Sequence, residues 1–480
     1  MESLLSLVNL IVMLIIISVM IIRVARGEAI FSLTHFFLLG FIQFQVLSAV
    51  FGLGMQNYTE AGVSTPESSG LIFTFMVIVF LTIFAVFWKT KALTFGFEKR
   101  LGRDIEPPTP GAMMAVAWGI ILFAGIFRFV IAYIPVISAL ALIIAAGLCA
   151  AAAGLGAWAW AKKWNNPIML GSFLALLAVA VFFTMYQNFG RRDTANVMVA
   201  AVFGAYQGYF RHVSLRRAII PLTLVGSLGL LTLGAYSSAR VEGAAQLSAA
   251  QTIRNLVTAN PFKGLQGMIW QDASAYSMYL IEARPEVNPY DTLHSLYYGA
   301  SMPIPRQFWP DKPQALGLTV VPEIGIRFKS GGFNIGPGMI GHIANDNPYI
   351  ALWLYPIIFA TFLRIADDVI KRCPNNPFVV MPLGSCLAEV LAFSRGELGL
   401  FVFRAVATIV SAYVVLWILE RMYAGATGRR LASAQYDESE DQLNANETAP
   451  EQEYGADLIQ PEYAREYMQS DDGHQTEPQR

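Results

Sequence analysis

Long apolar runs separated by short polar loops make up most of this chain. Several runs exceed about 18 residues, which is long enough to cross the hydrocarbon core of a bilayer as a helix. The runs are continuously apolar and do not alternate at period two, which disfavours a transmembrane β-barrel. The pattern therefore predicts an all-α, polytopic membrane protein with about 11 transmembrane helices. The predicted spans are 4–22, 31–54, 71–88, 112–131, 135–160, 167–187, 195–210, 218–236, 349–365, 378–393 and 398–419.

Lysine and arginine gather in alternate loops, after the first, third, fifth, seventh, ninth and last predicted spans. Because cytoplasmic loops carry an excess of these residues, the pattern predicts an outer N-terminus and a cytoplasmic C-terminus. The first span lacks a leading basic residue and is followed by Arg23 and Arg26. That is the reverse of a cleaved signal peptide, so we expect an uncleaved anchor.

Four parts follow from this topology. About eight transmembrane helices occupy 1–236, a large outer loop occupies 237–346, about three further helices occupy 347–430, and a tail follows from 431 to 480. The spacing of apolar residues from Leu265 to Ile281 predicts an amphipathic helix, which could lie on the membrane surface. After it come the proline-rich segment IPRQFWPDKP (Ile304 to Pro313) and a glycine-rich stretch.

Charge is distributed unevenly. Only 14% of residues are charged, against about 25% in soluble domains. The tail holds 13 acidic residues and two arginines, which leaves 31 basic and 21 acidic residues, a net charge of +10, for residues 1–430. Since the tail also has few aliphatic residues, we predict that it is disordered. The three cysteines predict no disulfide framework and the scattered histidines no metal site.

Five arginines lie where membrane rules disfavour them. Arg191 and Arg192 lie at the outer end of a predicted span, and Arg395 lies in a very short outer turn. Arg128 and Arg404 fall inside spans, towards their outer halves. A charge within a span costs about 2.5–3.5 kcal/mol on insertion scales, so it marks a cavity or an ion pair. A guanidinium holds phosphate oxygens in a bidentate fork. The set therefore predicts a site for an anionic substrate.

Structural roles for the same arginines remain open. Arg404 lies seven residues after Glu397, almost two helical turns, so these two side chains could neutralise each other. Arg128 could extend to the outer membrane surface. Arg191 could form an ordinary interfacial ion pair with Asp193.

The proline-rich segment allows two interpretations as well. Prolines fix the backbone and so lower the entropy lost in holding Arg306 and Lys312 towards a ligand. Alternatively, the segment is a stiff loop with Phe308 and Trp309 at the membrane interface.

Candidate general bases on the outer side are histidines and carboxylates, because deprotonating a sugar hydroxyl requires one within hydrogen-bond reach. We favour His294, His342 and Glu397. The other candidates are Asp272, Asp291, Glu323 and Asp346. No nucleophile elbow, phosphate-binding loop, zinc motif or nucleic-acid-binding pattern is present in the sequence.

The layout and three local motifs resemble those of bacterial oligosaccharide repeat-unit polymerases of the O-antigen type. The motifs are IPRQFWPDKP at 304–313, FNIGPGMIGHIAND at 333–346 and SRGEL at 394–398. The resemblance covers mainly 190–420. One departure is Gly341-His342, where many relatives carry a Gly-Glu pair, so a carboxylate role at that position would have to pass to His342.

The resemblance implies a metal-independent, cofactor-free glycosyltransferase of the bacterial inner membrane. It would polymerise undecaprenyl-diphosphate-linked oligosaccharides on the periplasmic side, beside a flippase and a chain-length regulator. Arg191, Arg192, Arg306, Lys312, Arg395 and Arg128 would bind phosphate. The alternatives are a glycan ligase that uses another acceptor and a non-enzymatic polysaccharide transporter.

Overall fold

The structure, a computed structural model, describes residues 1–91, 93–94, 104–105, 108–186, 191–213, 259–269, 273–325 and 335–427, with isolated positions between 223 and 258. All regular elements within these residues are helices. The predicted span 218–236 and the acidic tail 431–480 fall mostly or entirely outside them.

Eight helices in the described part of the chain are long and apolar enough to cross a membrane, which makes this a multi-pass α-helical membrane protein. They confirm eight of the predicted spans. They are α1 (Glu2–Ala25), the continuous α2 (Leu33–Phe41), η1 (Ile42–Val46) and α3 (Leu47–Gly54), α4 (Pro66–Thr90), α6 (Pro110–Phe129) extended by η3 (Ile131–Tyr133), α7 (Ser138–Ala161), α8 (Pro167–Met185), α17 (Pro348–Arg372) and α20 (Leu398–Thr427).

Two further predicted spans have a different form. The span predicted at 195–210 is α9 (Arg191–Gly208), whose first turn contains Arg191, Arg192 and Asp193. The span predicted at 378–393 is divided into two short helices, α18 (Pro377–Gly384) and α19 (Leu387–Ala392). The total of 11 spans therefore stays a prediction.

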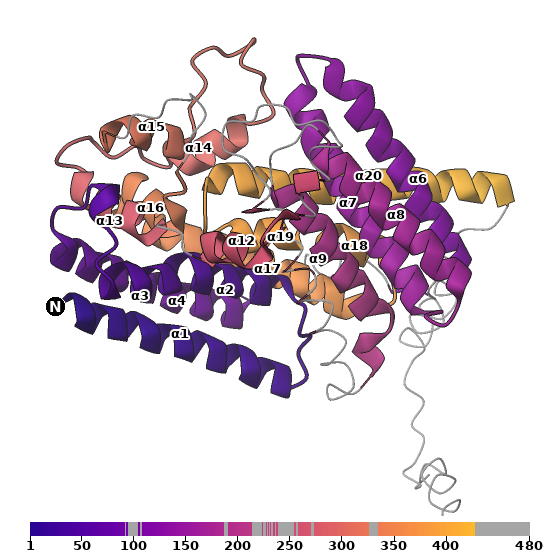
Figure 1. Cartoon of the computed structure of the whole chain (residues 1–480), viewed down its shortest axis with the longest axis horizontal. Helices are drawn as coiled ribbons and strands as arrows, with labels where there is room; N and C mark the ends of the chain where they lie inside the picture. The colour runs from indigo at the N-terminus through magenta and orange to yellow at the C-terminus, as the bar shows by residue number, and fades with distance from the viewer. Residues whose placement is uncertain are drawn as a thin grey trace, which may run out of the picture. The chain divides into compact units, whose positions relative to one another are not determined.

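The helices pack in two sets (Figure 1). The first set contains α1 to α4 and α17, together with α13 (Ala273–Ala283) and α16 (Gly338–Asn345). The second contains α6 to α9 and α20, with the alanine-rich α7 packed against α6, α8, α9 and α20. The short helix α19 joins the sets, because it contacts α2 in one and α9 and α20 in the other.

Asparagine–proline pairs begin four helices. Asn166, Asn260, Asn347 and Asn376 each precede the first proline of α8, α12 (Pro261–Ile269), α17 and α18, and each side-chain oxygen accepts the backbone N–H two residues on, at 2.9, 3.0, 3.3 and 3.1 Å. Proline suits a first helical position because its missing N–H would be unpaired there anyway. These helix starts are therefore encoded locally.

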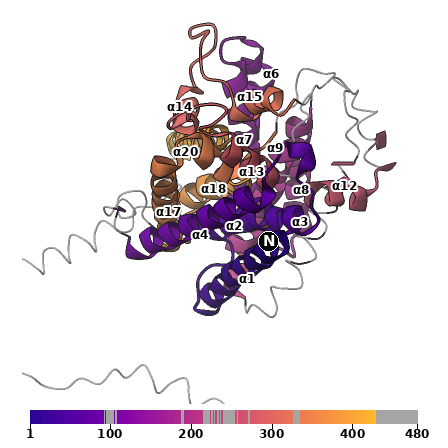
Figure 2. The ribbon, with the colours of Figure 1, turned by 90° about the vertical axis from the view of Figure 1, so that its left-hand side faces the viewer.

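Segments predicted to share the outer side lie together (Figure 2). The N-terminal amine is 3.2 Å from Glu67 at the start of α4. Glu282 at the end of α13 accepts hydrogen bonds from the backbone and hydroxyl groups of Ser64 and Thr65, at 2.8–2.9 Å. The N-terminus, the first outer loop and part of the long loop therefore meet at one end of the helices.

The region predicted as an amphipathic surface helix at 265–281 has another arrangement. It contains the end of α12 and most of α13, with 270–272 outside the described residues. Ala275, Met278 and Leu280 are buried, because α13 packs against α3, α4 and α16. Helix α13 is thus part of the helix packing and does not lie free on a membrane surface.

Close approach of α7 and α9 depends on glycine. A Cβ on Gly204 would overlap the carbonyl oxygen of Gly154, whereas a Cβ on Gly171 in α8 would meet nothing within 4 Å. We predict that Gly204→Ala destabilises the protein by about 1–3 kcal/mol, because α7 and α9 must separate. Thermal unfolding in detergent should show a lower midpoint for this variant. The control, Gly171→Ala, should match the wild type; equal midpoints for all three proteins would contradict this packing.

Candidate functional site

We call residues 291–325, which the sequence predicts to lie on the outer side, the outer segment. This segment contains α14 (His294–Ser301), the proline-rich loop and α15 (Leu316–Glu323). The two cations of this loop bind its own backbone. Arg306 donates to the carbonyls of Lys312 and Pro313 at 3.1 and 3.2 Å, and Lys312 Nζ donates to those of Met302 and Ile304 at 3.2 and 3.0 Å. Burial and the nearby Arg306 lower the pKa of Lys312. Arg306 is exposed, whereas Lys312 is buried and braces the loop.

Four consecutive residues, Ser394 to Glu397, join the outer segment to the helices. The Ser394 carbonyl accepts from Gln45 Nε2 at 2.5 Å and from the Met339 backbone at 3.3 Å. The Glu397 carboxylate accepts the backbone N–H groups of Leu316 and Gly317, both at 3.1 Å. Because these two amides belong to the first turn of α15, the negative charge also lies favourably at a helix N-terminus.

His342 is fully buried beside this turn. Its Nδ1 lies 2.6 Å from the Ser295 hydroxyl, and its Nε2 lies 2.9 Å from the Gly396 carbonyl, 3.2 Å from the Leu398 backbone nitrogen and 4.0 Å from Glu397 Oε1. These contacts involve both ring nitrogens. The geometry therefore favours positioning roles for His342 and Glu397, two of the three predicted bases.

Asp346 anchors α14 in a similar way. Its Oδ2 accepts from the Ser295 backbone at 2.7 Å and from the Tyr355 hydroxyl, while Oδ1 accepts from Asn345 at 3.1 Å. Close backbone contact adds to this attachment, because a Cβ on Gly399 of α20 would overlap the Ser295 carbonyl. The outer segment is thus held firmly on α16, α17 and α20.

His294, the third predicted base, is the nearest of the three to solvent. Its Nδ1 lies 2.6 Å from Asp291 Oδ2 and its Nε2 lies 2.9 Å from the Gln314 carbonyl. The side chain of Asp291 is 63% exposed. The ring of Tyr298 is parallel to the imidazole, and burial together with the Glu397 charge raises the pKa of this tyrosine to about 12. His294 therefore orients an accessible carboxylate.

Exposed aromatic rings cover part of the outer segment. Tyr297 and Trp309 meet edge to face with centroids 5.6 Å apart, and Tyr297 and Phe308 are 54% and 72% exposed. Flat aromatic faces beside hydrogen-bonding groups suit contact with sugar rings, which present apolar C–H faces.

A second group of predicted residues lies within the helices, below the outer segment. Arg404 of α20 forms ion pairs with Asp193 of α9 and with Glu389 of α19, the latter at 2.8 Å. Arg192 lies with its guanidinium carbon 4.2 Å from the centroid of Phe401, and its electrostatic neighbours are Glu389, Arg404 and Asp193. We call Arg192, Asp193, Glu389 and Arg404 the buried ionic cluster. Arg404 thus pairs with these two carboxylates, while Glu397 binds α15.

Two residues of the buried ionic cluster were missed in the sequence. Glu389 is 1% exposed, and its Oε2 has no hydrogen-bond partner among the described residues. It lies in the apolar stretch 378–393, so the rule that singled out the arginines, an ionisable group inside a span, would have found it. Asp193 was considered only as a partner for Arg191.

The remaining predicted arginines are more dispersed. Arg128 donates to the Tyr186 carbonyl at the end of α8 and has Asp193 as an electrostatic neighbour. Arg395 lies over Phe44, with its guanidinium carbon 5.7 Å from the ring centroid. Arg191 begins α9, and its side chain lies outside the described residues.

No set of three or more His, Cys, Asp or Glu side chains in the described ranges could hold a metal ion. Searches of family models, curated proteins and solved structures found no match to this chain.

The Glu397 contacts can be tested directly. We predict that Glu397→Gln destabilises the attachment of α15 by about 1–3 kcal/mol, because the amide nitrogen replaces one of two acceptor oxygens. Hydrogen exchange at the amides of Leu316 and Gly317 should become faster. Glu286→Gln, at an exposed carboxylate in the turn after α13, is the control. Unchanged exchange in Glu397→Gln would show that these contacts do not hold α15.

Proposed function

We propose that this protein is a membrane glycosyltransferase that polymerises undecaprenyl-diphosphate-linked oligosaccharide repeat units. The observation that carries the proposal is the concentration of arginine at the buried ionic cluster, below an outer segment that presents exposed aromatic rings. Charges inside a membrane protein are costly and by default mark functional sites. The motif resemblance adds the substrate class.

The charge balance suits an anionic substrate. Arg128, Arg192 and Arg404 face Asp193 and Glu389, so three cations meet two carboxylates. Arg192 is half-buried, and its guanidinium lies over the ring of Phe401. We assign Arg192 and Arg395 to the diphosphates of the lipid carriers and Arg404 to holding the two carboxylates in place.

The proposed reaction is a displacement at the anomeric carbon of the growing chain. A hydroxyl of the incoming lipid-linked repeat attacks that carbon, its bond to the diphosphate oxygen breaks, and the lipid diphosphate leaves with the bonding electrons. Arginines stabilise the negative charge that develops on the leaving group. Of the predicted bases, the pair formed by His294 and the exposed Asp291 is our choice to receive the hydroxyl proton.

Helix α20 connects the outer segment to the buried ionic cluster. Glu397 and Gly399 contact the outer segment, and Arg404 lies five residues further along, about 7–8 Å at 1.5 Å per residue. A glycan held by Tyr297, Phe308 and Trp309 would therefore extend from a diphosphate held near Arg192. The periplasmic location of the reaction and the undecaprenyl carrier are part of the proposal.

The test uses purified protein in liposomes with a lipid-linked repeat unit and measures product length. Arg192→Ala should slow elongation on the order of a hundredfold, as expected for loss of a charge that stabilises a leaving group. Arg192→Lys should retain part of the activity, because it keeps the charge and loses the bidentate fork.

Arg372→Ala is the matched control, since Arg372 is an exposed arginine at the end of α17. It should elongate glycans as the wild type does, and all variants should have similar thermal midpoints. Wild-type protein that moves lipid-linked units across the bilayer without lengthening them would instead indicate a transporter. Elongation unchanged in Arg192→Ala would refute the assignment of the site.

A further inference from the structure

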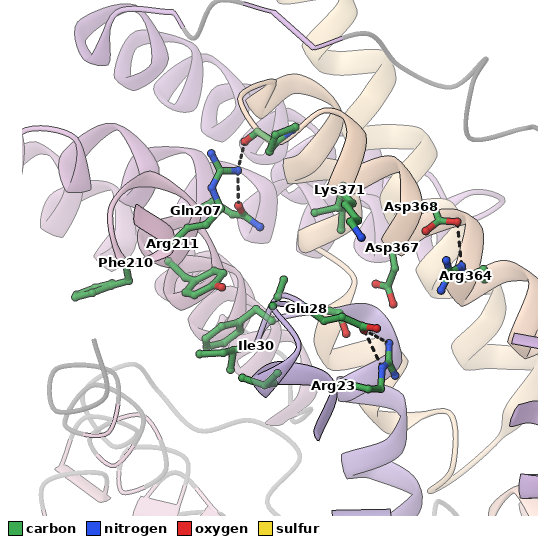
Figure 3. Close-up of a pocket in the computed structure, with 18 of the residues that line it drawn as sticks. Arg23, Glu28, Ile30, Gln207, Phe210, Arg211, Arg364, Asp367, Asp368 and Lys371 are labelled. Carbon is green, nitrogen blue, oxygen red and sulfur yellow. Dashed lines mark hydrogen bonds and ion pairs between the residues drawn. The ribbon is translucent and has the colours of Figure 1, made fainter. Parts of the chain in front are cut away.

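A cavity of about 410 Å³ lies at the ends of α1, α4 and α17 that the sequence predicts to be cytoplasmic (Figure 3). Arg23 of α1 and Arg364 of α17 both lie over the ring of Trp88 in α4, with guanidinium carbons 4.0 and 4.3 Å from its centroid. Charged groups beside tryptophan are typical of the interface between membrane and water. We therefore place one membrane boundary across the charged stretch of α17 that lines this cavity, which contains Arg364, Asp367, Asp368 and Lys371.

The other boundary follows from the length of α17. About 20 helical residues, at about 1.5 Å each, cross a hydrocarbon core of about 30 Å. Counted back from the middle of the charged stretch, this length ends near Pro348, where α17 begins. The start of α17 therefore lies at the opposite membrane surface, on the side that the sequence predicts to be outer.

Exposed aromatic side chains lie at the same level. Tyr349 and Trp353, about one turn apart on α17, are 79% and 59% exposed. The ring of Tyr290 meets that of Tyr349 edge to face, with centroids 6.4 Å apart. Because tyrosine and tryptophan are enriched where membrane meets water, these three rings support a boundary at the start of α17.

Residues 285–290, between α13 and α14, form what we call the α13–α14 loop, and contacts on both sides of it fix its height. Just before the loop, Arg284 donates to Asn345 Oδ1 and to both carboxylate oxygens of Glu323, each at 3.1 Å. Just after it, the backbone N–H of Asp291 donates to the Asn345 carbonyl at 3.0 Å. Asn345 ends α16, three residues before α17 begins, so the loop is held at the level of the membrane boundary.

Four of the six loop residues leave no backbone N–H group unpaired. Pro285 and Pro289 have no N–H, and Val287 and Asn288 both donate to the Ala283 carbonyl, at 3.0 and 3.1 Å. An N–H group without a partner is costly in a lipid environment. The backbone of the loop is therefore suited to a layer that contains little water.

The loop also exposes apolar side chains. Val287 is 71% exposed, and the two prolines beside it are exposed as well. Glu286 is the one charged residue of the loop and is exposed. Through the contact of Tyr290 with Tyr349, this apolar surface continues the exposed surface of a membrane-spanning helix.

We propose that the α13–α14 loop binds the surface of the lipid bilayer and anchors the outer segment to it. Val287 lies among the headgroups and first acyl carbons, and Tyr290 lies at headgroup level with the exposed rings of α17. The lipid surface is the partner because the loop is held at the membrane boundary and its apolar side chains join those of a membrane-spanning helix. Asp291, the next residue, is thereby held beside the headgroups with its carboxylate exposed.

The experiment measures depth by fluorescence quenching, with the full-length protein in phosphatidylcholine liposomes. A fluorophore on Val287→Cys is exposed to lipids that carry a nitroxide quencher either near the headgroup or at the end of the acyl chain. The three natural cysteines are buried, so the label reacts with the introduced one. The shallow quencher should act about threefold more strongly than the deep one, because interfacial side chains enter about 5–10 Å into the boundary between headgroups and acyl chains.

Two control positions calibrate the depth. Ile358→Cys, at an exposed residue near the middle of α17, should show the reverse order of quenching. Gln314→Cys, at an exposed residue before α15, should be quenched weakly by both lipids. Quenching at Val287 that matches Gln314 would overturn the proposal, because the loop would then lie in water, and quenching that matches Ile358 would overturn its interfacial depth. No glycan substrate is used, so the result is independent of the function proposed above.

Discussion

The position of α15 on the membrane helices depends on one carboxylate, that of Glu397. Its two oxygens accept the first amides of α15, and its backbone begins the turn into α20. The residues just before it bind Gln45, α16 and His342 through their carbonyls. A short polar turn thereby connects four elements from distant parts of the sequence, η1, α15, α16 and α20. Together with Asp346, which anchors α14, it fixes both ends of the proline-rich loop above the buried ionic cluster.

Much of the architecture could be predicted, because a membrane span is specified by the apolar composition of one continuous stretch of sequence. Eight predicted spans correspond to observed helices, with ends that differ by at most seven residues. The prediction was less successful where tertiary contacts decide the outcome. Helix α13 is buried by α4 and α16, which no local pattern specifies, and the segment 378–393 contains Pro382 and a break before α19.

The arginines of the candidate site could be predicted from the sequence, but their ion-pair partners could not. The arginines were found because charge within an apolar run is conspicuous. Their partners depend on helix rotation and crossing, so Arg404 was compared with Glu397 on its own helix, although its partners come from α9 and α19. The roles of Arg306 and Lys312 also required three-dimensional contacts, because proline content alone does not reveal which carbonyls a side chain reaches.

The four asparagine–proline helix starts have a consequence for how the protein is made. Each start is specified by adjacent residues, so the point at which a helix begins is already set while the chain is leaving the ribosome. The depth of α8, α17 and α18 relative to the bilayer can then be established one helix at a time. When the two helix sets assemble, the starts of these helices are already determined. Only the neighbours of each helix and its rotation about its own axis then remain to be set.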